Sequence, residues 1–257
     1  MLLAIDTATR ATSIALYRAE GIVAELTWQS RHHHTVETMT QIARLLELSR
    51  VAKNDLRAIG VALGPGSFTG LRVGMSIAKG LAFGQHIPLI GIPTLDALAC
   101  AHARSALPIW AMLEAGRGRY HIARYTASSG AIARVSDYAL TDAPGIVALA
   151  ERAEIAHALF CGDVRGELAQ LIAARLGDRA EIASPATNAR RAGFLAELAW
   201  ARFERGDFDD TAALAPLYLQ AILNHKSNDL LLQPGFSRRA DARARCGRGD
   251  ADRTRRV

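Results

Sequence analysis

The segment over residues 61–84 is the part of the sequence best suited to chemistry. It reads VALGPGSFTGLRVGMSIAKGLAFG, an apolar strand pattern that stops at Gly64-Pro65-Gly66 and continues as a helical pattern. Ser67 and Thr69 stand where a side-chain oxygen can accept hydrogen bonds from the free N–H groups of the first helical turn. A glycine-rich turn from strand to helix is able to hold a phosphate at the helix N-terminus.

The known phosphate-loop patterns do not fit this turn. A P-loop requires a lysine directly after its last glycine, whereas Lys79 lies more than two helical turns after Gly70. Gly64, Gly66 and Gly70 also miss the Gly-x-Gly-x-x-Gly spacing by one residue. Two further interpretations stay open, namely a tight corner with a closely packed helix and a helix that docks on a partner protein.

A row of small residues runs along the helix of this segment. Gly70, Gly74, Ala78 and Ala82 recur at every fourth position and therefore lie on one side of the helix. Glycine within a helix costs about 1 kcal/mol relative to alanine. Two glycines in one row are therefore explained best by the close approach of another backbone.

If that backbone belongs to a partner, Gly70, Gly74 and Ala78 are interface residues. The helix expected over residues 35–49 would supply the companion surface through Met39 and Leu46. The alternative is that the row packs against this chain's own sheet.

The glycine-rich segment resembles the signature of the TsaB (YeaZ) family. The resemblance covers about residues 1–220 and is densest in the first hundred. It also rests on residues 3–9, 13–16, 34–37, 90–98 and 216–219.

The resemblance implies a non-catalytic scaffold. Members of this family are accessory subunits that activate a TsaD-type transferase, together with a TsaE-type ATPase. The product is N6-threonylcarbamoyladenosine at position 37 of tRNAs that read codons starting with A. The implied partners are a TsaD-like catalytic subunit and a TsaE-like ATPase, with tRNA reached through the complex. A homodimer is a further assembly that the resemblance leaves open.

The order of strand and helix patterns points to a duplicated α/β fold. Strands are expected over residues 2–6, 12–18, 21–28, 58–63, 87–92, 108–113, 118–126, 131–140 and 158–162, and helices over 35–49, 68–84, 94–103, 144–153, 164–176 and 190–205. Three strands, a helix, a strand and a helix occur twice, as in the lobes of the actin/sugar-kinase/Hsp70 (ASKHA) architecture, which the family resemblance also implies.

We therefore expect three parts in the chain. Residues 1–104 form an N-terminal ASKHA-like lobe that carries the partner or dimer interface, and residues 105–222 form a degenerate second lobe. Residues 223–257 form a basic tail.

Proteins of this architecture usually bind ATP between their lobes, but the sequence lacks the necessary motifs. Asp6 ends the first strand, where such proteins place a carboxylate for a metal-bound phosphate, although a lone aspartate at this position is also typical of an Asx-turn. In the second lobe, Cys161-Gly162-Asp163 is the nearest remnant of a phosphate loop. We predict no cofactor; the alternative function is a stand-alone nucleotide-dependent enzyme of kinase-like fold.

Candidate metal ligands are equally sparse. By the resemblance, the catalytic relative TsaD holds a metal through two histidines four residues apart, and Thr94 and Leu98 occupy those positions here. The run His32–His34 with Glu37 remains, and we interpret it as a surface run before a helix. No His-Glu-x-x-His or Gly-x-Ser-x-Gly pattern occurs. We therefore predict no metal site, no catalytic residue and no enzymatic activity of this chain alone.

Composition is that of a globular protein with its own core. The chain has 257 residues, of which 50% are hydrophobic and 22% charged. No apolar run approaches the roughly 20 residues that span a bilayer. Cys100, Cys161 and Cys246 are an odd number at wide spacing, which suits reduced thiols. We predict a cytoplasmic protein without a membrane association.

Most of the net charge lies at the C-terminal end. Residues 234–257 contain eight arginines against three aspartates, so they supply +5 of the total of +6. Because large apolar residues are almost absent after Phe236, this segment cannot bury a core, and we predict that it is disordered. A non-specific contact with RNA phosphates is the functional alternative.

Overall fold

The computed structural model describes residues 1–30, 34–219 and 243–245. A first sheet contains β1 (Leu2–Asp6), β2 (Ala11–Arg18), β3 (Gly21–Gln29), β4 (Ala58–Gly64) and β5 (Leu89–Pro93), in the order β3-β2-β1-β4-β5. The strands β1, β4 and β5 are parallel, and β2 is antiparallel to β1 and β3. Every residue of β1 is buried, as expected for an apolar strand that is covered on both faces.

A second sheet repeats this arrangement. It contains β6 (Ile109–Gly116), β7 (Arg119–Ser128), β8 (Ala131–Arg134), β9 (Ala139–Asp142), β10 (Ala158–Gly162), β11 (Ala180–Ile182) and β12 (Arg243–Arg245). The path β8-β7-β6-β10-β11 has the same order and the same strand directions as β3-β2-β1-β4-β5. The predicted duplication is therefore confirmed.

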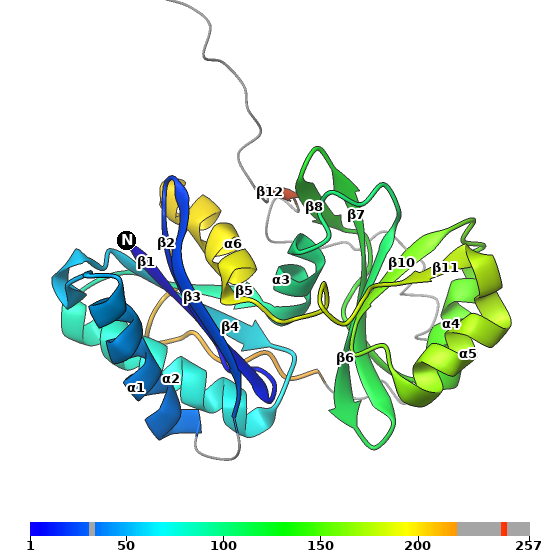
Figure 1. Cartoon of the computed structure of the whole chain (residues 1–257), viewed down its shortest axis with the longest axis horizontal. Coiled ribbons are helices and arrows are strands. Elements are labelled where there is room, and N and C mark those ends of the chain that lie inside the picture. The colour runs from blue at the N-terminus through cyan, green and yellow to red at the C-terminus, as the bar shows by residue number, and fades with distance from the viewer. Residues whose placement is uncertain (31–33, 220–242, 246–257) are drawn as a thin grey trace, which may run out of the picture.

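Helices separate the two sheets and cover their outer faces (Figure 1). Helices α1 (His34–Leu48) and α2 (Phe68–Gln85) cover the outer face of the first sheet, and α4 (Ala143–Arg152) and α5 (Gly166–Leu176) cover that of the second. Helices α3 (Thr94–Cys100) and α6 (Ala192–Glu204) lie between the sheets, in a core cluster to which both sheets contribute. Short 3-10 turns occur at Lys53–Asp55 and Gly177–Arg179.

The position of α6 corrects the predicted division of the chain. The sequence placed residues 190–219 in the second lobe, but α6 packs on β1 and β2 of the first sheet. Gly60 of β4 makes room for it, because a Cβ there would stand 3.0 Å from the Cβ of Ala199. The chain then follows the first sheet, where Leu217 N–H donates to Leu63 O at 2.7 Å. The boundary near residue 104 stays a prediction.

Most predicted elements differ from the observed ones by one to three residues at an end. The helix expected over 94–103 ends at Cys100, and the strand expected over 131–140 is divided into β8 and β9. The division occurs at Ser136, whose Oγ accepts the backbone N–H of Arg124 at 2.9 Å and so replaces a strand partner.

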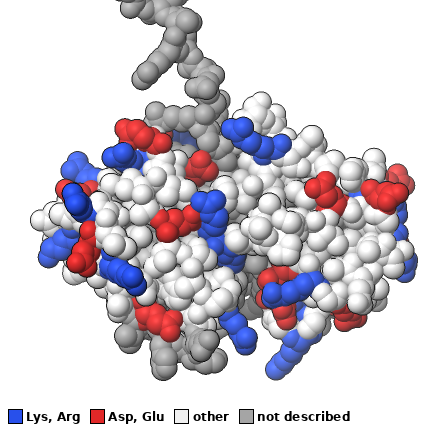
Figure 2. Space-filling model, viewed as in Figure 1, with Lys and Arg blue, Asp and Glu red and all other residues white. Residues whose placement is uncertain are grey.

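Part of the basic segment is ordered. Residues 243–245 form β12, which pairs antiparallel with β8, so the prediction of disorder is wrong for these three residues. The rest of residues 220–257, together with His32 and His33, lies outside the described residues. On the face shown in Figure 2, basic and acidic side chains are interspersed rather than gathered by sign.

The cysteines differ from one another. Cys161 is a buried free thiol, and burial raises its pKa. Cys100 is disulfide-bonded, so the prediction of reduced thiols is wrong at this position. Cys246 lies outside the described residues. Among the helices that the structure describes, each is too short or too polar to span a bilayer.

Candidate functional site

The glycine-rich turn joins β4 to α2 as predicted. Ser67 is the N-cap of α2, and its Oγ accepts the backbone N–H of Gly70 at 3.3 Å. Gly64 has a φ of +107°, which favours glycine, and a Cβ there would approach the carbonyl oxygen of Leu217. The turn therefore brings α2 into close contact with the rest of the first lobe.

The row of small residues on α2 is filled by Thr7, which follows β1. Thr7 Oγ1 donates to Gly70 O at 2.7 Å, and a Cβ on Gly74 would collide with the same Oγ1. Ala78 is fully buried. The alternative of packing against the chain's own sheet is thus the observed arrangement, and Gly70, Gly74 and Ala78 are not available as a free docking face.

The other two predicted interface residues lie on α1. Leu46 is half-buried against the outer core of the first lobe, whereas Met39 is 42% exposed. The structure therefore leaves Met39 at the surface and places the remaining four predicted residues wholly or partly inside.

Several large apolar side chains on the outer helices of the first lobe are exposed. We define the α1–α2 face by Met39, Leu48, Phe68, Phe83 and Tyr218, all of which are exposed. The ring centroids of Phe68 and Tyr218 are 5.3 Å apart, so Tyr218 belongs to this face although it lies far along the chain.

An arginine orders the aromatic part of this face. The guanidinium of Arg72 lies 3.7 Å from the ring centroid of Phe68, and its Nε donates to the hydroxyl of Tyr218 at 3.2 Å. The sequence did not indicate this group, because Tyr218 and Arg72 are 146 positions apart.

Asp6, the candidate phosphate-site carboxylate, is held by the chain itself. Its Oδ1 accepts the N–H of Ala8 at 3.0 Å, which confirms the predicted Asx-turn. Its Oδ2 forms an ion pair with the guanidinium of Arg190. The two side chains are only 3% and 9% exposed. Arg190 thus supplies the positive charge that a metal would supply at such a carboxylate.

The end of β10 is also engaged internally. Gly162 has a φ of +98°, and its N–H donates to Asn188 Oδ1 at 2.8 Å. Asp163 accepts the N–H of Glu114 at 3.0 Å and lies 3.4 Å from the guanidinium of Arg165. This remnant of a phosphate loop therefore has its acidic group paired.

The positions matched to metal-binding histidines do not fit a metal. Thr94 is fully buried, and Leu98 is 6% exposed, both on α3. A hydroxyl and an isobutyl group do not replace two imidazoles as ligands. Within the described part of the chain, no three His, Cys, Asp or Glu side chains are placed to hold an ion.

A buried carboxylate joins α3 to the second sheet. Asp96 Oδ1 accepts the hydroxyls of Tyr125 at 2.6 Å and Tyr138 at 2.7 Å. Burial raises the pKa of Asp96, and the two phenol hydrogen bonds oppose that rise. The guanidinium of Arg134 lies 4.0 Å from the ring centroid of Tyr138.

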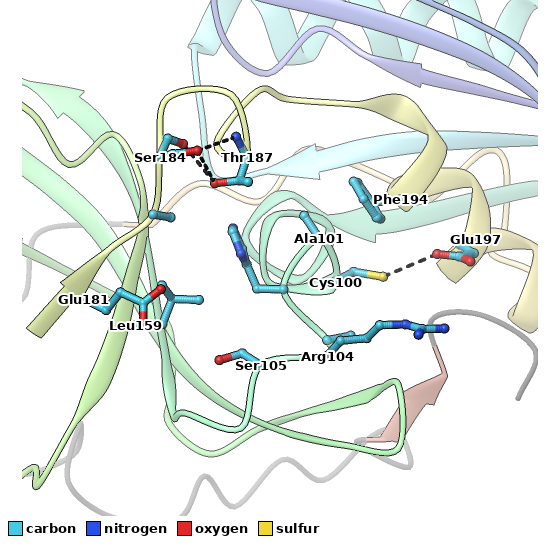
Figure 3. A pocket seen from close by; sticks show the side chains of 13 residues that line it. Cys100, Ala101, Arg104, Ser105, Leu159, Glu181, Ser184, Thr187, Phe194 and Glu197 are labelled. Carbon is cyan, nitrogen blue, oxygen red and sulfur yellow. Dashed lines mark hydrogen bonds between the residues drawn. The ribbon is translucent and has the colours of Figure 1, made fainter.

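A pocket of about 620 Å³ lies at the C-terminal end of α3 (Figure 3). Its lining includes His102 after α3, Glu181 of β11, Phe194 of α6 and the turn at Ser184 and Thr187. Burial lowers the pKa of His102, although the Glu181 carboxylate opposes the shift. The imidazole is therefore neutral near pH 7 and offers hydrogen bonds rather than a charge.

These features define a class of protein: a duplicated ASKHA-type α/β fold in which the chain's own residues occupy the ends of β1 and β10. The chain matches the family described as TsaD: tRNA N6-adenosine threonylcarbamoyltransferase over residues 2–190, and it therefore belongs to that family. Within the family, its similarity is to TsaB, also named YeaZ.

Two curated relatives are named tRNA threonylcarbamoyladenosine biosynthesis protein TsaB. The chain is 34% identical to that of Bacillus subtilis over 52% of its own length and 58% of the relative's. It is 37% identical to that of Escherichia coli over 48% and 54%, respectively. The match thus spans about half the length of these relatives.

Solved structures support the fold over a longer stretch. A protein with similarity to peptidase YeaZ from Pseudomonas aeruginosa has a TM-score of 0.71 at 25% identity, covering 85% of this chain and 99% of that one. YeaZ from Pseudomonas aeruginosa gives a TM-score of 0.68 at 23% identity, covering 85% and 99%.

Proposed function

We propose that this chain is a non-catalytic scaffold for a TsaD-type transferase that forms N6-threonylcarbamoyladenosine at position 37 of tRNA. The observation that carries the proposal is the ion pair between Asp6 and Arg190, within a chain of the TsaD family. A carboxylate that is already neutralised by a buried guanidinium is poorly suited to hold a metal-bound phosphate. The burial of Thr94 and Leu98 supports the same conclusion for the metal-binding positions.

The proposed contact with the transferase is the α1–α2 face. The contacting rings of Phe68 and Tyr218 are both exposed, and exposed apolar groups in contact with each other are typical of protein interfaces. Phe68, Arg72 and Tyr218 also belong to the residue classes that are enriched in such interfaces. Met39 is the residue of the originally predicted interface that this proposal retains.

The proposed setting is the cytoplasm, where tRNA is modified. The partners are a TsaD-like catalytic subunit and a TsaE-like ATPase, and tRNA is bound by the complex rather than by this chain alone. A homodimer through the same α1–α2 face would compete with the heterodimer, because one surface cannot serve both.

Titration calorimetry with the TsaD-like protein of the same organism tests the proposed contact. Met39→Asp and Phe83→Asp place a charge on the α1–α2 face, and each is expected to weaken binding at least about tenfold. Ile22→Asp is the matched control, since Ile22 on β3 is 45% exposed, close to the 42% of Met39, and lies outside this face. Unchanged affinity in both face variants would refute the contact.

The alternative is a stand-alone nucleotide-dependent enzyme of kinase-like fold. A ligand at about 100 times its dissociation constant adds about 2.7 kcal/mol to the free energy of unfolding. Melting in the presence of magnesium and ATP therefore separates the two functions. A clear rise of the melting temperature would favour the enzyme, and no rise supports the scaffold.

A further inference from the structure

One segment crosses between the two sheets and contacts both. Residues 183–191, which we call the strap, connect β11 to α6 and run from the second sheet to the first (Figure 1). The strap is locally ordered by a turn, because Asn188 N–H donates to Ser184 O at 3.0 Å and the hydroxyls of Ser184 and Thr187 lie 3.1 Å apart (Figure 3).

The strap contacts the second sheet through Asn188. The Oδ1 of Asn188 accepts the N–H of Gly162 at the end of β10, and its Nδ2 donates to Ala183 O at 2.9 Å. The amide therefore uses its acceptor for the sheet and its donor for the strap. This pairing fixes the side chain between them.

The strap contacts the first sheet through Arg190. Its guanidinium pairs with Asp6 at the end of β1, and its carbonyl oxygen accepts the hydroxyl of Thr27 at 3.3 Å. Directly after the strap, Ala192 N–H donates to Ser13 Oγ at 2.9 Å. Three neighbouring strands of the first sheet thus hold this end.

The two contacts are only two residues apart. An extended chain spans at most about 3.6 Å per residue, so the Cα atoms of Asn188 and Arg190 lie within about 7 Å of each other. The ends of β1 and β10 therefore face a single short stretch of backbone. In α/β folds, ligands bind outside the carboxyl ends of the parallel strands, which is the position that the strap takes here.

We propose that the strap is a built-in substitute for a ligand between the two sheets. Arg190 supplies the cation and Asn188 supplies the polar contact to the second sheet. The strap thereby fixes the orientation of the two sheets without nucleotide or metal. Proteins with two lobes commonly close by a hinge movement around their ligand. In this chain the strap holds one orientation permanently.

The buried ion pair fits a role in orientation better than one in stability. Only one nitrogen of Arg190 pairs with Asp6, and its Nε and Nη1 have no hydrogen-bond partner among the described residues. Buried pairs of this kind are weak sources of stability, whereas removal of one partner leaves an uncompensated charge. Removing both charges should therefore restore stability but not the fixed orientation.

Distance measurements between two spin labels test the proposal on the full chain. One label is attached at Lys53 beside the first sheet and one at Gln170 on α5, both of which are exposed. The variants are Arg190→Met, Asn188→Ala and the double variant Asp6→Asn/Arg190→Met. Arg191→Met is the matched control within the strap: its guanidinium also pairs with the first sheet, at Glu25 of β3, but it is 47% exposed, and ion pairs at the surface contribute little.

The distance distribution is expected to broaden in all three strap variants and to keep its width in Arg191→Met. Thermal melts identify variants that fail to fold, and the double variant is expected to melt above Arg190→Met. The proposal would be overturned if the double variant is folded and its distance distribution is as narrow as that of the unmodified chain. A distribution in the unmodified chain that narrows when magnesium and ATP are added would also overturn it.

Discussion

Thr7 occupies the space beside Gly74 where any side chain on the helix would have to stand. Its Oγ1 also donates to Gly70 O at 2.7 Å, so the turn after β1 is fitted into the row of small residues on α2. The glycines are thus required by contact within one lobe.

Gly74→Leu is therefore expected to unfold the first lobe rather than to block a partner. Overpacking of this kind typically costs about 1–3 kcal/mol, and the leucine would displace Thr7 in addition. Urea unfolding measures the change. Gly80→Ala on the same helix is the control: a Cβ there meets no atom of the described residues within 4 Å, so the helix propensity of alanine should stabilise the chain by up to about 1 kcal/mol. A Gly74→Leu chain as stable as the unmodified one would contradict this account.

His121 should make stability depend on pH. Burial and the nearby Arg119 lower its pKa from 6.5 to about 4. Between these values the unfolded chain binds a proton that the folded chain does not, so stability falls as the pH decreases from 6.5 to about 4. Urea unfolding at pH 7 and pH 4.5 measures this decrease in the free energy of unfolding. The decrease should be smaller in His121→Leu than in the unmodified chain. His157→Leu, at an exposed position, should keep the loss of the unmodified chain.

The two phenol hydrogen bonds to Asp96 should stabilise the junction between α3 and the second sheet. Tyr125→Phe leaves the carboxylate with one donor, and loss of a hydrogen bond to a charged group costs about 1.5–3 kcal/mol. The change is measured as a lower melting temperature. Tyr120→Phe, at a half-buried position on the same strand, should melt close to the unmodified chain. Equal effects of the two substitutions would argue against a special role of Asp96.

The chain alone should not transfer a threonylcarbamoyl group. With threonylcarbamoyl-adenylate and tRNA as substrates, we expect modified adenosine only after a TsaD-like protein is added, as detected by mass spectrometry of digested tRNA. The variant Thr94→His/Leu98→His should stay inactive, because both positions are buried and leave no room for an ion and substrate. Modified tRNA formed by the unmodified chain alone would refute the scaffold function.

The sequence predicted local features better than contacts between distant segments. The strand before Gly64, the cap at Ser67 and the Asx-turn at Asp6 depend on neighbouring residues and were confirmed. The repeated succession of strands and helices followed from the order of the periodic patterns along the chain. The strand end, the cap and the Asx-turn are each determined within a few residues along the chain.

The site depends on pairs that the sequence does not reveal. Arg190 and Asp6 are 184 positions apart, and no local pattern marks either as the partner of the other. The apolar pattern of α6 likewise predicts a helix but not the sheet that it covers. The assignment of residues 190–219 to the second lobe failed for this reason. Gly60 was a possible signal in the sequence, because a glycine inside a strand often marks a site where another segment packs closely against the sheet.

The return of α6 to the first sheet has a consequence for synthesis on the ribosome. The strand β5 ends at Pro93, but α6 begins only at Ala192, about a hundred residues later. Translation proceeds at about 5–20 residues per second, so α6 is synthesised roughly 5–20 s after β5. During this time the inner face of the first sheet is not covered by α6. The N-terminal half therefore cannot complete its core while it emerges, and a nascent chain stalled before α6 should be a substrate for chaperones.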